Sequence, residues 1–140
     1  MICWWFENLA GFTTWNGMDF SGPEVSLYHL WHHRDHVAVT PLTNSPDGKT
    51  NHGFLEGADS RIEEYFNEFH YHVFNRMHTT VLNNQEFTFN IMLGKKVSGR
   101  ISHYYKQTQD GCSFYAETEI GMDGGLMATL FNKLNFSYLY

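Results

Sequence analysis

The feature that most constrains the fold is the alternation of apolar and polar side chains through residues 71–121. In residues 86–93, for example, every second side chain is large and apolar, beginning with Phe87 and Phe89. The alternating segments are separated by sequences typical of tight turns, which are Asn83-Asn84, Gly94-Lys95-Lys96 and Gln109-Asp110-Gly111. We therefore predict four strands joined as an antiparallel meander, at residues 71–82, 86–93, 97–106 and 112–121.

The remainder of the chain predicts a few short elements around this meander. We expect helices at residues 1–9 and 124–135, a strand at 37–42, and an extended or turn segment at 24–30. Glycine, proline and asparagine predict loops at residues 11–23 and 43–53. Together these elements predict one α+β domain over residues 1–140, since 140 residues is a usual length for a single domain.

Residues 59–69 are ambiguous between a helix and a strand. Ile62, Tyr65 and Phe66 fall at helical spacing, and on a helix Glu64 would point to water. On a strand Ile62, Glu64 and Phe66 would share one face. A carboxylate turned inward in this way needs a polar partner or a metal ion.

Composition excludes several classes of function. The formal net charge is −6 without a basic block, so we expect no nucleic-acid binding. No apolar run approaches the length of a membrane span, and we expect no membrane association. Cys3 and Cys112 give no disulfide framework, which is typical of a protein of the reducing cytoplasm.

Residues 28–36, with the sequence Tyr-His-Leu-Trp-His-His-Arg-Asp-His, hold four histidines beside an aspartate. Histidine is the commonest metal ligand in proteins and a frequent proton shuttle. His32 and His36 share a face if the segment is helical, and also if it is extended. The segment could equally be a solvated surface turn, and Asp35 could orient one of the imidazoles.

This segment resembles the Tyr-x-x-Trp-His-Pro-x-Asp-His signature of the zinc-dependent 2,4-diacetylphloroglucinol hydrolases, which cleave the carbon–carbon bond between an acetyl group and a phenolic ring. Further similarity to that family covers most of residues 1–125 and lies in Cys3-Trp4-Trp5-Phe6, Ile101-Ser102-His103-Tyr104, Asp110-Gly111 and Ile120-Gly121. The resemblance implies a helix-grip fold of the Bet v 1 or START type, in which a curved antiparallel sheet surrounds a cavity.

The resemblance also implies a function and a set of site residues. It implies a metal-dependent hydrolase that binds Zn²⁺ through His36 and Glu64, with Glu63 and Glu68 as the other carboxylates for the second position. Its substrate would be a small aromatic ketone or polyketide-like molecule with an acyl group on a phloroglucinol-type ring. The family comparison favours the strand reading of residues 59–69, which turns Glu64 inward.

Three further residues take roles from the resemblance. Tyr28 would position the aryl ketone, and His103 would act in acid–base chemistry or orient the substrate. By alternation His103 lies on an apolar face, where a lone histidine is often only a hydrogen-bonded core residue. Tyr115 would bind a phenolic oxygen, but alternation allows only one of Phe114 and Tyr115 to face the cavity.

The sequence departs from the family pattern in ways that keep other functions open. His33 replaces the proline of the signature, and the long N-terminal region that precedes the family's catalytic domain is missing. No histidine follows His103, so the family's C-terminal His-x-x-x-Glu ligands are absent. We therefore also consider a non-catalytic binder of small aromatic ligands and an inactive truncated relative. The aromatic residues 136–140 would favour a homo-oligomer.

Overall fold

The computed structural model describes residues 1–66, 71–121 and 129. Its elements, in chain order, are α1 (Ile2–Asn8), β1 (Phe12–Thr14), β2 (Glu24–Ser26), α2 (Leu27–Trp31), β3 (His36–Pro41), β4 (Asp59–Phe66), β5 (Tyr71–Leu82), β6 (Glu86–Leu93), β7 (Lys96–Thr108) and β8 (Gly111–Ile120). Within this part of the chain no helix is both long and apolar enough to cross a membrane.

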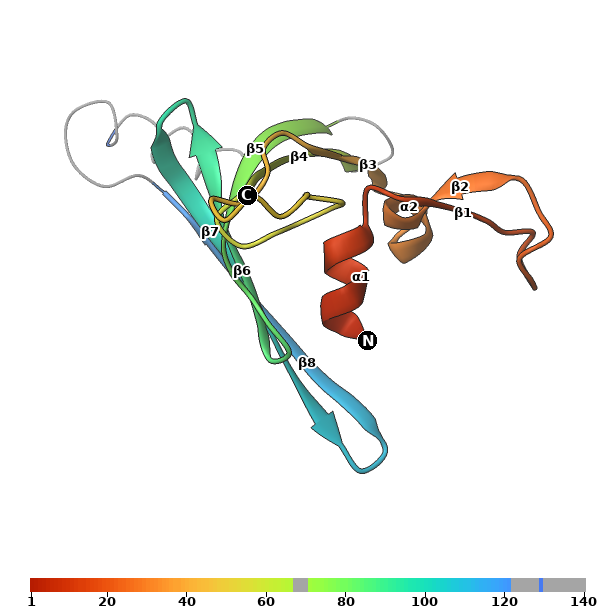
Figure 1. The fold of residues 1–140 in the computed structure, drawn as a ribbon. Coiled ribbons are helices and arrows are strands. Elements are labelled where there is room, and N and C mark those ends of the chain that lie inside the picture. Colours follow the sequence, from red (N-terminus) through yellow and green to blue (C-terminus); the bar gives the residue numbers. More distant parts are fainter. Residues whose placement is uncertain (67–70, 122–128, 130–140) are drawn as a thin grey trace.

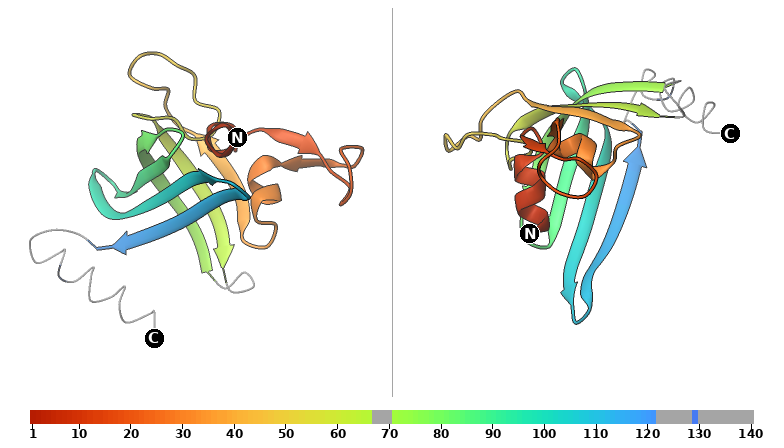
Figure 2. Two further views of the ribbon diagram at one scale, coloured as in Figure 1. Left: turned by 90° about the horizontal axis from the view of Figure 1, so that it is seen from below. Right: turned by 90° about the vertical axis from the view of Figure 1, so that its right-hand side faces the viewer.

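Strands β3 to β8 form one six-stranded antiparallel sheet in which spatial order follows sequence order. Each strand pairs with the next along the chain, as the alternating pattern predicts. The sheet is strongly bent, and Figures 1 and 2 show α1 on the inner side of the bend. The chain is therefore an α+β protein built on an antiparallel meander.

The core forms where α1 meets the inner face of the sheet. Phe6 of α1 lies 4.3 Å from Phe87 between ring centroids and 6.2 Å from Tyr105. The other buried apolar side chains of this cluster include Leu9, Val39, Phe54, Ile62, Met77 and Phe89. Burial of such large side chains is worth about 1.5–3 kcal/mol each, so this contact stabilises both α1 and the bent sheet.

The loop between β3 and β4 is held against α1 by its backbone. Phe54 N–H donates to the Phe6 carbonyl at 3.0 Å, and Ala10 N–H donates to the His52 carbonyl at 3.1 Å. Between these bonds, a Cβ atom on Gly53 would lie 2.6 Å from the Phe6 carbonyl oxygen and 2.7 Å from Leu9 N. Glycine is therefore required where the loop meets the helix.

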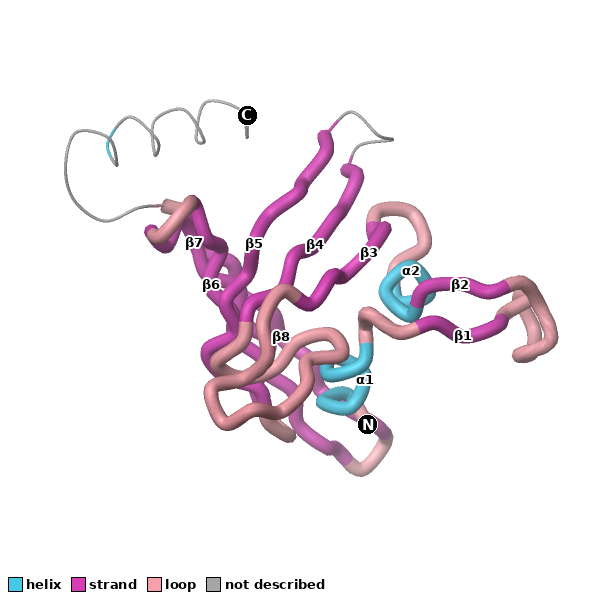
Figure 3. The backbone as a smooth tube through the Cα atoms, turned by 45° about the horizontal axis from the view of Figure 1, so that its top comes forward, coloured by secondary structure: helices cyan, strands magenta, loops and turns pink. Residues whose placement is uncertain are grey.

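The secondary structure agrees with the sequence prediction in the sheet and differs from it near the N-terminus. The helix at 1–9, the strand at 37–42 and the four meander strands are confirmed, and residues 59–66 are a strand. The prediction of an irregular loop at 11–23 was wrong in part, because β1 within it pairs with β2 (Figure 3). The helix predicted at 124–135 lies outside the described residues, apart from Thr129.

We predict that Gly53→Ala lowers the free energy of unfolding by about 1–3 kcal/mol, because the added methyl group meets backbone atoms that can move only with α1. Thermal or urea unfolding followed by circular dichroism measures this change. His52→Ala is the matched control, since the His52 side chain is exposed and its removal should leave stability nearly unchanged. Equal stability of the two variants would show that Gly53 does not lie against the backbone of α1 as described.

Candidate functional site

A cavity of about 170 Å³ lies between α1, α2 and the inner face of the sheet. Most of its wall is apolar or aromatic, and four of its residues have titratable side chains: Tyr28, His36, Glu64 and His103. The other lining residues are Phe6, Leu9, Trp31, Phe54, Ile62, Phe87, Phe89 and Ile101. A mainly apolar cavity with a few converging polar groups is typical of a small-molecule site.

An irregularity in the pairing of β3 with β4 directs His36 into this cavity. His36 pairs with Glu64 and Ala38 pairs with Glu63, so Val37 is an extra residue in β3. In a regular strand His36 and Val39 would face opposite sides, because side chains alternate. The bulge instead lets Val39 join the core while His36 lines the cavity.

The short helix α2 brings Tyr28 to the same place. Tyr28 N–H donates to the Ser26 hydroxyl at 3.2 Å, which caps the helix where it begins. The Tyr28 ring stacks on the His36 imidazole, with centroids 4.0 Å apart and planes 7° apart, and its hydroxyl donates to Glu64 Oε1. His36 Nε2 lies 3.5 Å from the same carboxylate oxygen. Tyr28, His36 and Glu64 therefore form one connected group, which we call the His36–Glu64 site.

Burial sets the protonation of this site. It lowers the pKa of His36 to about 4, so the imidazole is neutral at neutral pH. Its Nδ1 lies 3.3 Å from the Tyr28 carbonyl oxygen, to which a neutral ring donates, leaving the Nε2 lone pair facing Glu64. Burial raises the pKa of Glu64, and burial together with Glu64 raises that of Tyr28, which stays a phenol.

His103 enters the cavity from β7 and is surrounded by aromatic rings. It stacks on Phe87 with centroids 5.4 Å apart and planes 11° apart, and it also contacts Phe6 and Phe89. Its Nδ1 is buried without a hydrogen-bond partner among the residues that the structure describes. Burial lowers the pKa of His103, and the nearby backbone of Phe87 offsets this only in part. A ligand with a polar group could satisfy this atom.

The His36–Glu64 site supplies two donors of the kinds that zinc binds. Two ligands at about 2.0–2.2 Å from a tetrahedral zinc lie about 3.3–3.6 Å apart, a range that includes the 3.5 Å between His36 Nε2 and Glu64 Oε1. His36 also has the ligand-ready tautomer, with Nδ1 directed at a carbonyl. Within residues 1–66 and 71–121, however, no group of three His, Cys, Asp or Glu side chains could hold a metal ion. The described residues therefore supply two of the ligands of one zinc site.

The structure places the remaining predicted residues away from this site. Tyr115 stacks on Tyr104 at 6.2 Å on the opposite face of the sheet, so β8 turns Phe114 inward and we omit Tyr115 from the site. Glu63 lies 2.9 Å from His72 Nε2, also on the opposite face, and Glu68 lies outside the described residues.

His32 and Asp35 of the histidine-rich segment also lie outside the cavity wall. His32 is exposed, and its Nδ1 lies 3.5 Å from Asp35. Asp35 therefore faces His32, and the Tyr28 carbonyl is the group that orients His36. The signature segment is thus part cavity wall and part solvated surface.

Sequence reasoning missed part of the cavity wall. Phe54 reaches it from a loop without periodicity, so no local signal marks it. Phe6 and Trp31 belong to the motifs that resemble the family, but no site role was predicted for either; both line the cavity, and their ring centroids lie 5.7 Å apart. Their role depends on how α1 and α2 pack together, which no spacing within either segment reveals.

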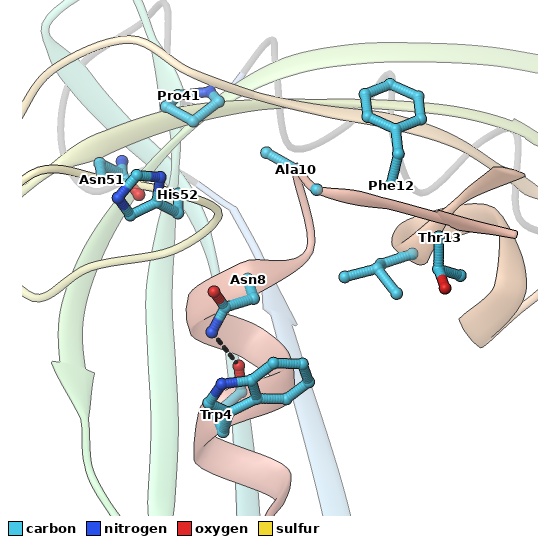
Figure 4. Close-up of a pocket in the computed structure, with 10 residues that line it drawn as sticks. Trp4, Asn8, Ala10, Phe12, Thr13, Pro41, Asn51 and His52 are labelled. Carbon is cyan, nitrogen blue, oxygen red and sulfur yellow. Dashed lines mark hydrogen bonds between the residues drawn. The ribbon is translucent and has the colours of Figure 1, made fainter. Parts of the chain in front are cut away.

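A larger and more open hollow of about 570 Å³ lies on the other side of α1 (Figure 4). Trp4 and Asn8 of α1, Phe12 of β1 and His52 of the β3–β4 loop lie around it. His52 is its single titratable side chain among the described residues. We therefore place the candidate chemistry in the smaller cavity.

Comparison of the chain with models of known protein families, with curated proteins and with solved structures finds no match.

The lowered pKa of His36 predicts how the stability of the metal-free chain depends on pH. Native His36 stays neutral down to pH about 4, whereas in the unfolded chain it takes up a proton near 6.5. Between these values the unfolded chain binds more protons, so stability falls as pH falls. Glu64, with its raised pKa, contributes in the opposite sense, since it keeps its proton to higher pH in the native state.

Between pH 7 and 4, the free energy of unfolding of His36→Gln should fall by on the order of 2 kcal/mol less than that of wild type, because glutamine does not titrate. Urea unfolding between pH 7 and 4, in the presence of a chelator, measures it. His33→Gln, which changes an exposed histidine three residues away, should leave the slope unchanged. An identical slope for wild type and His36→Gln would show that His36 is not buried as a neutral group.

Replacement of His103 tests whether its buried Nδ1 lacks a hydrogen-bond partner in the native protein. We predict that His103→Phe raises the free energy of unfolding by about 1 kcal/mol, because phenylalanine keeps the aromatic packing and removes a buried nitrogen without a described partner. Thermal unfolding tests this, with His52→Phe as the exposed control. Destabilisation beyond the control would mean that Nδ1 has a partner in the native protein.

Proposed function

We propose that this chain is a metal-dependent hydrolase that cleaves the carbon–carbon bond between an acyl group and a phenolic, phloroglucinol-type ring. The observation that carries the proposal is that Tyr28, His36, Glu64 and His103 all line one small, mainly aromatic cavity. The resemblance to the diacetylphloroglucinol hydrolases implied these four residues, which come from three separate segments of the sequence. Their convergence supports that resemblance.

The architecture is compatible with the wider proposal. A bent antiparallel sheet around a cavity supports assignment to the helix-grip, Bet v 1-like class, and we propose a cytoplasmic location. His36 and Glu64 would hold Zn²⁺ through Nε2 and Oε1. When bound there, the ion would polarise the acyl carbonyl or activate water.

The chain's own residues would bind and orient the substrate. The aromatic wall takes up the ring and excludes water, which strengthens polar interactions inside. Tyr28, whose pKa burial raises, donates to Glu64 and can accept a hydrogen bond from a ring hydroxyl of the substrate. This contact would fix the acyl group near His36 and Glu64.

The reaction adds water across the bond between the acyl carbon and the ring carbon. Water attacks the carbonyl carbon, the bond pair leaves to the ring carbon, and a proton is delivered there, giving a carboxylic acid and the deacylated phenol. His103, a neutral imidazole in the same cavity, would bind the substrate's polar groups or transfer this proton.

A second candidate, a non-catalytic binder of small aromatic ligands, rests on a different observation. The described residues bring together only two metal-binding side chains, whereas catalytic zinc sites usually have three protein ligands. The aromatic cavity and the Nδ1 of His103, which has no hydrogen-bond partner among the described residues, would serve a binder equally well. A metal requirement distinguishes the two functions.

Zinc content and cleavage of an acylphloroglucinol test the hydrolase proposal. We expect near-stoichiometric zinc in the purified chain, a loss of metal and of at least about 100-fold in activity in His36→Ala and Glu64→Gln, and release of the carboxylic acid by wild type. Elemental analysis and chromatography of the products provide the readouts.

The neighbouring residues offer matched controls for these variants. Glu63→Gln changes the adjacent carboxylate, which contacts His72 on the other face, and His33→Ala changes an exposed histidine of the same segment. Both should retain metal and activity. If the wild-type chain takes up no zinc but binds the aromatic ketone in a calorimetric titration, the hydrolase proposal is wrong and the non-catalytic binder is supported.

A further inference from the structure

Residues 12–26 form a two-stranded arm that projects from the body of the protein (Figures 1 and 3). β1 and β2 pair over three residues each, and the connecting segment forms the tip of the arm. Met18 and Phe20 at this tip are 86% and 68% exposed. Phe20 packs on Trp15, with centroids 5.3 Å apart, and the figures show the tip directed away from the sheet.

Polar contacts within the tip fix its shape. Asn16 Oδ1 accepts from the backbone N–H groups of Met18 and Asp19, at 2.8 and 2.9 Å. Asp19 Oδ1 accepts from Asn16 Nδ2 at 2.8 Å and from the Ser21 N–H at 2.9 Å. The apolar side chains are therefore presented from an ordered turn, which lowers the entropy lost on binding.

The hollow beside α1 has the volume and the apolar lining to receive such a tip (Figure 4). Its volume of about 570 Å³ falls in the range of established binding pockets. Trp4, Phe12, Leu27 and Pro41 provide apolar wall, and Asn8 provides part of a polar rim. Trp4 is 54% exposed and Phe12 is 66% exposed, so this wall is open to a partner.

The charges of arm and hollow are compatible. The chain carries a formal net charge of −6, so two copies repel each other on average. Among the residues that the structure describes, no carboxylate lines the hollow, and His52 is the one titratable group there. Asp19, the acidic residue at the tip, would therefore enter a place free of like charge and close to an imidazole.

From these observations we infer that the tip of the arm of one copy inserts into the hollow beside α1 of a second copy. Phe12 belongs both to the arm and to the wall of the hollow, so the two surfaces are continuous and a two-fold axis makes the exchange reciprocal. The exposed parts of Met18, Phe20, Phe12 and Trp4 offer on the order of 600 Å² per copy. With their polar rims they approach the roughly 800 Å² per partner of a stable complex.

The first test is the oligomeric state of the full chain, by analytical ultracentrifugation over a range of concentrations. We expect a monomer–dimer equilibrium in which Met18→Ser and Phe20→Ser each raise the dimer dissociation constant by about tenfold or more. Leu93→Ser, which changes a 53% exposed apolar residue outside the arm and the hollow, should leave it unchanged. A monomer at every concentration, or a dimer that both tip variants leave intact, would overturn the inference.

Crosslinking then shows where the tip lies. In a Cys3→Ser, Cys112→Ser background, one tagged copy carries Met18→Cys and an untagged copy carries Asn8→Cys. A short thiol-reactive crosslinker should join the mixed pair, and Phe20→Ser in the first copy should reduce the yield. Crosslinks only between two Met18→Cys copies would indicate tip-to-tip contact and would refute insertion into the hollow.

Discussion

The site depends on the pairing of His36 with Glu64 across β3 and β4. The bulge at Val37 lets this pair and the Val39–Ile62 pair face the same side of the sheet. A regular strand would keep either the core contact of Val39 or the cavity position of His36. The extra residue Val37 therefore allows the edge strand β3 both to pack in the core and to place His36 in the site.

Burial gives this pair its chemistry. The packing of α1 and the β3–β4 loop on the sheet closes the cavity, and the same loss of solvent lowers the pKa of His36 while raising that of Glu64. Gly53 permits the loop to approach α1, which brings Phe54 to the cavity wall. Changes at this contact, far from His36 in sequence, would therefore alter both the protonation and the shape of the site.

Local patterns predicted most of the sheet, because alternation and turn residues act between neighbours in the chain. They failed at β1, whose three residues gave too short a pattern within a glycine-rich segment, and at α2, which occupies most of the segment predicted to be extended or a turn. They left Glu64 ambiguous, because its segment matched both periods, and only pairing with β3 and β5 decided it. They could not choose between Phe114 and Tyr115, because the register of β8 on β7 sets which of them faces inward.

The sequence by itself determined the antiparallel meander, the N-terminal helix and the chemical types of the candidate site residues, because these follow from side-chain identity and short-range spacing. Only the tertiary structure decided that Tyr28, His36, Glu64 and His103 share one cavity, that the Tyr28 carbonyl rather than Asp35 orients His36, and that an arm with an apolar tip leaves the body of the protein. These features depend on strand register, on a bulge and on the packing of distant segments, and none of them is encoded in the spacing of any one segment.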